Sequence, residues 1–122
     1  MKIEMELPIP VSENQYRRFV PGVKYPIIST AGRKYHEIVK ERFYDSAQTP
    51  ISGEVIVTVD FYPPDRRKRD LDNLFKCLFD SIVAAGCIAD DSLIQVIHAF
   101  KYEPIPNGGL IHILIEPKNM IG

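Results

Sequence analysis

Two stretches decide the fold of this chain: EVIVTVDFY at residues 54–62 and DLDNLFKCLFDSIVAAG at residues 70–86. The first alternates between apolar and polar side chains, which is the period of a β-strand that buries one face. The residues on that face are Val55, Val57, Val59 and Phe61. The second places apolar side chains every three or four residues, which predicts an amphipathic helix over 70–85. Gly86 suits the left-handed residue that follows a helix.

The segments on either side extend this strand and helix into a layered domain. Residues 3–7 alternate between apolar and charged side chains and predict a strand. Residues 93–102 and 110–116 predict two more strands, separated by a Pro-, Asn- and Gly-rich turn at 104–109.

A second helix is expected over residues 31–46, capped by Thr30. Its apolar face consists of Ala31, Tyr35, Ile38, Val39 and Phe43. Residues 9–28 look like a long polar loop with a short strand near 25–28, and loops of this length are often functional. The predicted order is β-α-β-α-β-β, an α+β (α/β-like) fold with two helices on a small mixed sheet.

The chain has 122 residues, of which 45% are hydrophobic, and a formal net charge of −1. These values predict one globular domain over residues 1–122 and exclude disorder. No apolar run approaches the roughly 18 residues of a membrane helix, and the first residues lack a signal-peptide core. Cys77 and Cys87 are too few for a disulfide framework and lack zinc-site spacing with the histidines. We therefore expect a cytoplasmic protein.

The segment that carries chemistry reads DRRKRDLDNLFK, from residue 65 to residue 76. Its four consecutive cations followed by acids suit a polyanion docked beside a divalent metal ion. On one helix, positions 70 and 72 diverge by about 200°, so both carboxylates share a metal only if Asp70 lies at or before the N-cap. Asp72 then lies in the first turn, and Lys76 follows one turn later on the same face.

Carboxylate ligands of this kind suit Mg²⁺, with Mn²⁺ as an alternative. Such an ion activates water and neutralises charge on a scissile phosphate, while Lys76 would stabilise the transition state. The same residues also fit a structural role. Asp70 would then be an ordinary N-cap, Asp72 and Lys76 a surface ion pair, and residues 90–91 a solvated acidic loop.

The run from Asp65 to Asp80, with the later Ala85-Gly86 and Asp90-Asp91-Ser92, closely resembles the RusA family of Holliday junction resolvases. The resemblance extends to PIPVSEN at residues 8–14 with Arg17, and to Gly108-Gly109-Leu110. It therefore spans most of the chain. Its most specific part is the RDLDNLxK block followed by the Asp-Asp pair.

This resemblance implies a homodimeric endonuclease, often encoded by a phage or prophage, that needs Mg²⁺ or Mn²⁺. Such enzymes cut two strands of a four-way junction symmetrically, so recombination and repair of nucleoid DNA are the implied setting. No nucleotide cofactor and no membrane partner are expected. The implied metal ligands are Asp70, Asp72 and Asp91, with Asp90 as adjacent support, and the implied catalytic lysine is Lys76.

Two features depart from the family pattern. Cys87-Ile88 stands where many members carry an aromatic residue, which bears on local packing. The chain is also less basic than is usual for the family, which bears on its affinity for DNA.

A DNA-binding face is expected on two basic segments, and phosphate contacts there would make binding steeply salt-dependent. Its expected residues are Asn14, Arg17, Arg18, Lys24, Arg66, Arg67, Lys68 and Arg69. Three aromatic side chains, Tyr16, Phe19 and Tyr25, are interleaved with the basic residues of the first segment, 17–24. They would either stack near the junction or pin the loop to the body of the protein.

The chain between Asp72 and Asp91 leaves open which subunit's site Asp91 serves. The helix from Asp72 to Gly86 is about 21 Å long, and the five steps from Gly86 to Asp91 reach at most about 17 Å. Asp91 therefore returns to its own chain's metal only if that segment doubles back. Antiparallel packing of two such helices would instead bring it to the partner, so we hypothesise that Asp91 completes or borders the partner's site.

Three other functions fit the same residues. The first is a nuclease for other branched or flapped DNA, which cleavage of four-way, three-way and linear substrates separates. The second is a junction-binding protein without activity, for which Asp70→Asn would change no catalysis. The third is a structural dimer without DNA affinity, which a gel shift at low salt would identify.

Overall fold

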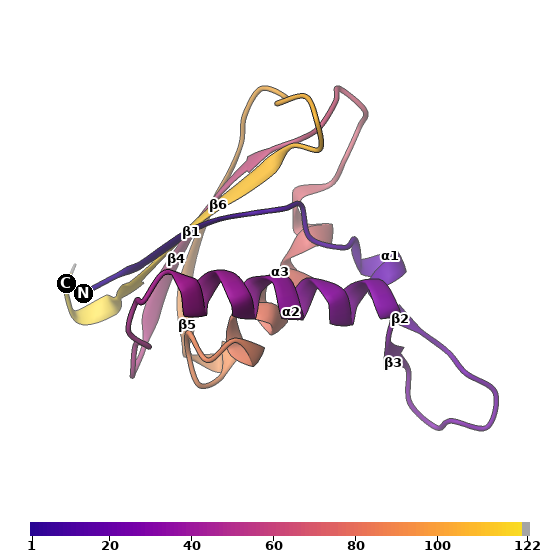
Figure 1. Cartoon of the computed structure of the whole chain (residues 1–122), viewed down its shortest axis with the longest axis horizontal. Helices are drawn as coiled ribbons and strands as arrows, with labels where there is room; N and C mark the ends of the chain where they lie inside the picture. Colours follow the sequence, from indigo (N-terminus) through magenta and orange to yellow (C-terminus); the bar gives the residue numbers. More distant parts are fainter. Residues whose placement is uncertain (121–122) are drawn as a thin grey trace.

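A four-stranded mixed sheet forms the centre of the computed structural model, which describes residues 1–120 (Figure 1). Its strands are β1 (Ile3–Leu7), β4 (Val55–Tyr62), β5 (Ile94–Lys101) and β6 (Leu110–Pro117), in the order β1-β6-β4-β5. β4 runs parallel to β5 and antiparallel to β6, and β1 runs antiparallel to β6. The predicted strands and the mixed sheet are confirmed, whereas the last two residues of the domain expected over 1–122 lie outside the described residues.

A helical crossover joins β4 to β5. The 3₁₀ helix η1 (Leu71–Leu74) leads directly into α3 (Phe75–Ala84), so the helix expected over 70–85 is present but begins with a tighter turn. It ends in a Schellman motif, in which Gly86 has a φ of +85° and the Cys87 N–H donates to the Ile82 carbonyl at 2.9 Å. Gly86 is confirmed as the helix stop, and the chain turns back there toward β5.

The second helix, α2 (Thr30–Asp45), is capped one residue earlier than predicted. The side chain of Ser29 accepts a hydrogen bond from the Gly32 N–H at 3.1 Å, so Thr30 is the first helical residue rather than the cap. Tyr35, Val39 and Phe43 are buried as expected. Two residues of the expected apolar face differ, because Ala31 is exposed and Ile38 is only half-buried.

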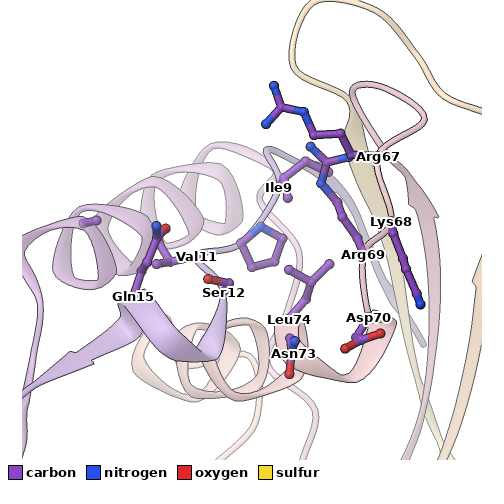
Figure 2. Close-up of a pocket in the computed structure, with 12 residues that line it drawn as sticks. Ile9, Val11, Ser12, Gln15, Arg67, Lys68, Arg69, Asp70, Asn73 and Leu74 are labelled. Carbon is purple, nitrogen blue, oxygen red and sulfur yellow. The ribbon is translucent and has the colours of Figure 1, made fainter.

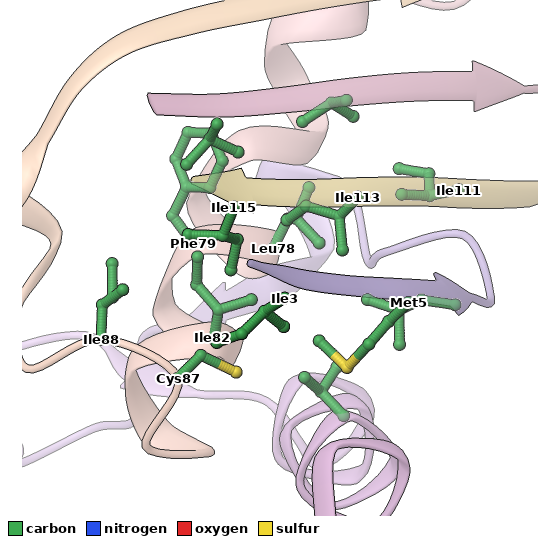
Figure 3. Close-up of a cluster of buried hydrophobic side chains, with 14 of the residues drawn as sticks. Ile3, Met5, Leu78, Phe79, Ile82, Cys87, Ile88, Ile111, Ile113 and Ile115 are labelled. Atoms are coloured by element: carbon green, nitrogen blue, oxygen red, sulfur yellow. The ribbon is translucent and has the colours of Figure 1, made fainter. Parts of the chain in front are cut away.

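The core lies between the two helices and one face of the sheet. Alternate residues of β1 and β6 are buried and the others are partly or fully exposed, so the helices cover a single face. Figure 3 shows α3 packing Leu78, Phe79 and Ile82 toward that face. Cys77 and Cys87 are fully buried in this core, and burial raises the pKa of their thiols to about 11 and about 12.

Residues 9–28 contain more structure than the single short strand expected near 25–28. A short helix, α1 (Glu13–Tyr16), is followed by β2 (Arg17–Arg18), which pairs with β3 (Ile27–Ile28). We call residues 17–28 the basic hairpin. It projects beyond the N-terminal end of α2 (Figure 1), so it is the part of the chain best placed to reach outward.

The predicted turn at 104–109 does not close a hairpin, because β5 and β6 lie on opposite sides of β4. The turn instead crosses the end of β4, where the Ile105 N–H donates to the Pro63 carbonyl at 2.8 Å. The crossing therefore fixes the start of the segment that carries the basic residues and the aspartates. Across residues 1–120, no helix combines the length and apolar character needed to cross a bilayer.

Candidate active site

Asp70 and Asp72 stand at the start of the crossover helix. Asp70 is the N-cap residue of η1 with extended backbone angles, φ −88° and ψ 123°, and its side chain makes no capping hydrogen bond. Asp72 is exposed in the first turn. The structure thus confirms that Asp70 lies outside the helix, the condition under which the two carboxylates can face one ion. The alternative role of Asp70 as an ordinary N-cap is not supported, because its side chain accepts no capping hydrogen bond.

The acidic residues of this region divide into two groups. Asp65, Asp80 and Asp90 each have a partner within the chain: Arg69, Lys76 and Ser92, respectively. By contrast, no hydrogen bond or ion pair within residues 1–120 engages the carboxylates of Asp70, Asp72 or Asp91. These three side chains are also exposed, so their oxygens are accessible to a cation or a substrate.

Asp91 is presented by a short turn that Asp90 stabilises. Asp90 is the N-cap of the 3₁₀ helix η2 (Asp91–Leu93), and its Oδ2 accepts from the Ser92 N–H at 3.0 Å and from the Ser92 hydroxyl. The bond from the Ser92 hydroxyl lowers the pKa of Asp90. One carboxylate oxygen of Asp90 is therefore used to stabilise the turn, whereas the neighbouring Asp91 side chain is exposed.

Asp70 lines a recess of about 700 Å³ between the crossover segment and the N-terminal segment. Ile9, Val11, Ser12 and Gln15 form one wall, and residues 67–70 with Asn73 form the other. In Figure 2, Asp70, Asn73 and the tip of Lys68 lie at the same end of the recess, and Arg67 reaches toward the other end. A phosphate drawn into the recess by these cations would lie beside Asp70.

Lys76 and Asp91 line a second recess, of about 390 Å³, together with His36, Asp80 and Asp90. The ion pair suggested for Asp72 and Lys76 is wrong, because Lys76 Nζ lies 3.2 Å from Asp80 Oδ1. The segment after Gly86 brings Asp91 back beside α3 of its own chain, where it lines the same recess as Lys76.

The structure does not gather the three expected metal ligands into one chain's site. Asp70 lines the first recess and Asp91 the second, while Asp72 lines neither. Among residues 1–120, no three histidine, cysteine or acidic side chains lie close enough together to hold a metal ion. Any ion held by these aspartates therefore needs further ligands from DNA, from a second subunit or from side-chain movement.

The four cations at 66–69 are not equally available. Arg69 contacts Asp65 through both of its terminal nitrogens, at 2.5 and 3.3 Å, and this hydrogen bonding lowers the pKa of Asp65 to about 2. Arg66 pairs with Glu103 at 2.7 Å. Arg67 and Lys68 are exposed, and Arg67 lies 3.8 Å from Asp65. The charge that this loop offers to a polyanion therefore rests mainly on Arg67 and Lys68.

The three aromatic side chains near the basic hairpin behave differently from one another. Tyr16 is fully buried and pins the base of the hairpin, whereas Phe19 is 84% exposed and Tyr25 is 68% exposed. Lys24 lies over the Tyr25 ring at 5.6 Å. Arg17, Arg18 and the α1 residue Asn14 are also exposed. The hairpin therefore presents cations and flat apolar rings together.

Sequence reasoning missed Asp80 and His36 near Lys76, and it missed the contact between Tyr16 and Asp80. The spacing from Lys76 to Asp80 is the same four residues that suggested an Asp72 pair, so this partner was available from the sequence. No local pattern connects Tyr16 and His36 to a residue 40 or more positions away. Their role emerges only from the packing of α1 and α2 against α3.

Comparison with known proteins places this architecture in a family. The family model for "Endodeoxyribonuclease RusA" matches residues 2–113. The crossover junction endodeoxyribonuclease RusA of Shigella sonnei is 34% identical over 113 residues, which cover 89% of both chains. Its namesakes from Escherichia coli K12 and from Enterobacteria phage 82 are 33% and 34% identical over the same share of each chain. The chain therefore belongs to the RusA family of endodeoxyribonucleases.

Proposed function

We propose that this protein is a Mg²⁺-dependent endonuclease that resolves four-way DNA junctions by paired symmetric nicks. One observation carries the proposal beyond family membership. Within residues 1–120, the exposed carboxylates of Asp70, Asp72 and Asp91 have no partner, whereas the acidic neighbours on the same segments all have one. Exposed carboxylates that no protein group engages are available as ligands for a divalent cation, and the basic loop beside them can attract a phosphate.

The chemistry of these donors fits magnesium. Mg²⁺ is commonly held by one or two carboxylates together with waters and substrate phosphates, so a complete protein cage is not required before DNA binds. Asp70 and Asp72 would hold the ion, and Asp91 would complete or border the site. When bound, the ion supplies an activated water and neutralises charge on the scissile phosphate.

The remaining steps belong to the chain's own residues. Arg67 and Lys68 draw the phosphodiester backbone into the recess beside Asp70. Lys76 places a positive charge near the reacting phosphate, where negative charge grows during attack by water. The cations and exposed rings of the basic hairpin contact the backbone and stack on bases near the branch point.

Paired nicks require two sites, and one chain carries one such set of aspartates, so the active form is a homodimer. The face of the sheet that the helices leave open carries Phe100 and Tyr102, which are 49% and 44% exposed. Phe100 lies on β5, an edge strand, and Tyr102 follows the last residue of that strand. This aromatic patch supports association with a second copy.

The direct test is cleavage of a mobile-core four-way junction with Mg²⁺ by the wild type and by Asp72→Asn. We expect symmetric nicks from the wild type and at least about a hundredfold slower cleavage from Asp72→Asn, because even outer partners of a metal site contribute 10- to 100-fold. Asp45→Asn, which changes an exposed acid at the far end of α2, is the matched control and should cut normally.

Two further measurements separate the alternatives. Junction binding by Asp72→Asn in a gel shift should persist, which shows that chemistry rather than folding was lost. Equal cleavage of three-way and four-way substrates would indicate a general branched-DNA nuclease, and an uncut junction with intact binding would indicate a non-catalytic binder.

A further inference from the structure

A chain of polar contacts runs from the base of the basic hairpin to Lys76. Lys76 Nζ lies 3.2 Å from Asp80 Oδ1, and the other oxygen, Asp80 Oδ2, accepts from the Tyr16 hydroxyl at 2.8 Å. The Tyr16 hydroxyl oxygen lies 2.8 Å from His36 Nε2. Three elements, α1, α2 and α3, thus contribute to the environment of one lysine.

The direction of these bonds follows from counting protons. The Tyr16 hydroxyl has one proton, which it gives to Asp80, so His36 must donate an N–H from Nε2 to the hydroxyl oxygen. Burial lowers the pKa of His36, which favours this neutral donor form. Burial, with the bond to Asp80, raises the pKa of Tyr16 far above its ordinary value, so the hydroxyl keeps its proton.

Tyr16 is itself held firmly. Its ring is fully buried, and a Cβ on Gly32 would come within 2.8 Å of both Tyr16 Cδ1 and Ile28 Cγ2, so α2 packs against the ring with no space to spare. The Tyr16 carbonyl accepts from the Ser29 N–H at 2.8 Å. The hydroxyl therefore has a fixed position from which to orient Asp80.

Helix stability alone does not account for this arrangement. A lysine that precedes its acidic partner by four residues is the less favourable order for an isolated helix. The Lys76 side chain is 39% exposed and that of Asp80 is 24% exposed, so the pair lies at the wall of the second recess rather than in open solvent. Asp91 lines the same recess.

We propose that Asp80, oriented by the Tyr16 hydroxyl, is a positioning residue that holds the Lys76 ammonium group at the Asp91 side of α3. This inference rests on the proposed nuclease function, in which Lys76 acts at the scissile phosphate. A lysine side chain has four rotatable bonds. If its ammonium group is already fixed before the substrate binds, less conformational entropy is lost in reaching the transition state, and the chemical step is faster. Asp80 and Tyr16 touch neither the phosphate nor the ion.

The test compares two Tyr→Phe variants, each of which loses a buried tyrosine hydroxyl. Tyr16→Phe keeps the buried ring and removes both hydrogen bonds of the hydroxyl, the one it donates to Asp80 and the one it accepts from His36. Tyr35→Phe is the matched control, because the Tyr35 ring is 3% exposed and its hydroxyl donates to the Pro8 carbonyl at 2.7 Å. Among residues 1–120, no hydrogen bond connects the Tyr35 hydroxyl to Asp80 or Lys76. Thermal unfolding of both variants shows whether their losses of stability are similar.

We expect Tyr16→Phe to lower kcat for junction cleavage about tenfold while leaving the Kd for the junction within about twofold. Asp80→Asn should show the same split with a larger loss of kcat. Tyr35→Phe should match the wild type in both. Equal effects of Tyr16→Phe and Tyr35→Phe on kcat would overturn the positioning role.

A second readout does not depend on activity. ¹⁵N relaxation of the Lys76 ammonium group, measured in the metal-free protein, should show a restricted head group in the wild type and in Tyr35→Phe. It should show a mobile one in Tyr16→Phe and in Asp80→Asn. Unchanged Lys76 mobility overturns the positioning inference even if the wild type cuts junctions. A wild type that leaves junctions intact while Tyr16→Phe frees Lys76 overturns the proposed function, and with it the catalytic purpose of the positioning.

Discussion

Gly109 lies where the turn after β5 crosses the end of β4. Its φ is +66°, and a methyl group there would overlap the Tyr62 carbonyl oxygen and the backbone of Pro63 and Pro64. We expect Gly109→Ala to reduce the free energy of unfolding by about 3 kcal/mol, from the left-handed backbone and the overlap together. Urea unfolding measures this loss.

Gly53→Ala serves as the control, because Gly53 has a φ of +86° but open space around the added methyl group. Gly53→Ala should reduce the free energy of unfolding by only about 1–2 kcal/mol, because alanine disfavours the left-handed backbone conformation. Equal losses of unfolding free energy in the two variants would show that the turn does not pack tightly against the end of β4. The comparison matters for the site, because Pro63 and Pro64 lead directly into the segment that carries Asp70.

The basic hairpin acts as an element because its base is fixed and its tip is exposed. Phe19, 84% exposed, is its largest uncovered apolar group. We expect Phe19→Ala to weaken binding of a four-way junction about tenfold, since stacking on a base contributes about 1–3 kcal/mol, and to weaken binding of a linear duplex less. Fluorescence anisotropy with both DNAs measures the difference.

Tyr44→Ala is the control for that substitution. Tyr44 is 85% exposed but stands near the far end of α2, so its loss should affect neither DNA. A Phe19→Ala protein that binds junctions as tightly as the wild type does would remove the hairpin ring from the proposed interface. The hairpin cations would then account for binding through phosphate contacts alone.

The elements that the sequence predicted well are those with long periodic patterns. β4 and α3 each bury one regular face, and Gly86 ends α3 through a motif that requires its backbone freedom. The two-residue strands of the hairpin are too short to show a period. Ser29 and Thr30 are both good capping residues, and only the position of the Gly32 N–H distinguishes them.

The site was predictable where its geometry is local. The divergence of positions 70 and 72 on a helix required Asp70 to lie outside it, and Asp70 does. The partner of Lys76 was not predictable, because Asp72 and Asp80 are equally spaced from it and the choice depends on Tyr16, which lies 60 residues earlier in the chain. The strand order also depends on long-range pairing, so the insertion of β6 between β1 and β4 left no local signal.

At the scale of the whole molecule, Asp70 and Asp91 open onto different recesses of one chain. If Asp91 serves the partner's site in the proposed homodimer, a dimer of one Asp70→Asn chain and one Asp91→Asn chain keeps one site with both aspartates. Neither parent dimer keeps any. A random mixture would then recover about a quarter of the wild-type sites, because half of the dimers are mixed and each has one intact site of two.

The mixed dimers should therefore nick four-way junctions on one strand without resolving them, whereas each variant alone should be inactive. The measurement is the ratio of nicked to resolved junction after the two proteins are unfolded and refolded together. Refolding each variant alone provides the control for the procedure. If Asp91 instead serves its own chain, both sites of every mixed dimer lack one aspartate, and the mixture will be as inactive as its parents. The ratio of single to paired nicks thus reports which subunit supplies Asp91, independently of which residues supply affinity for DNA.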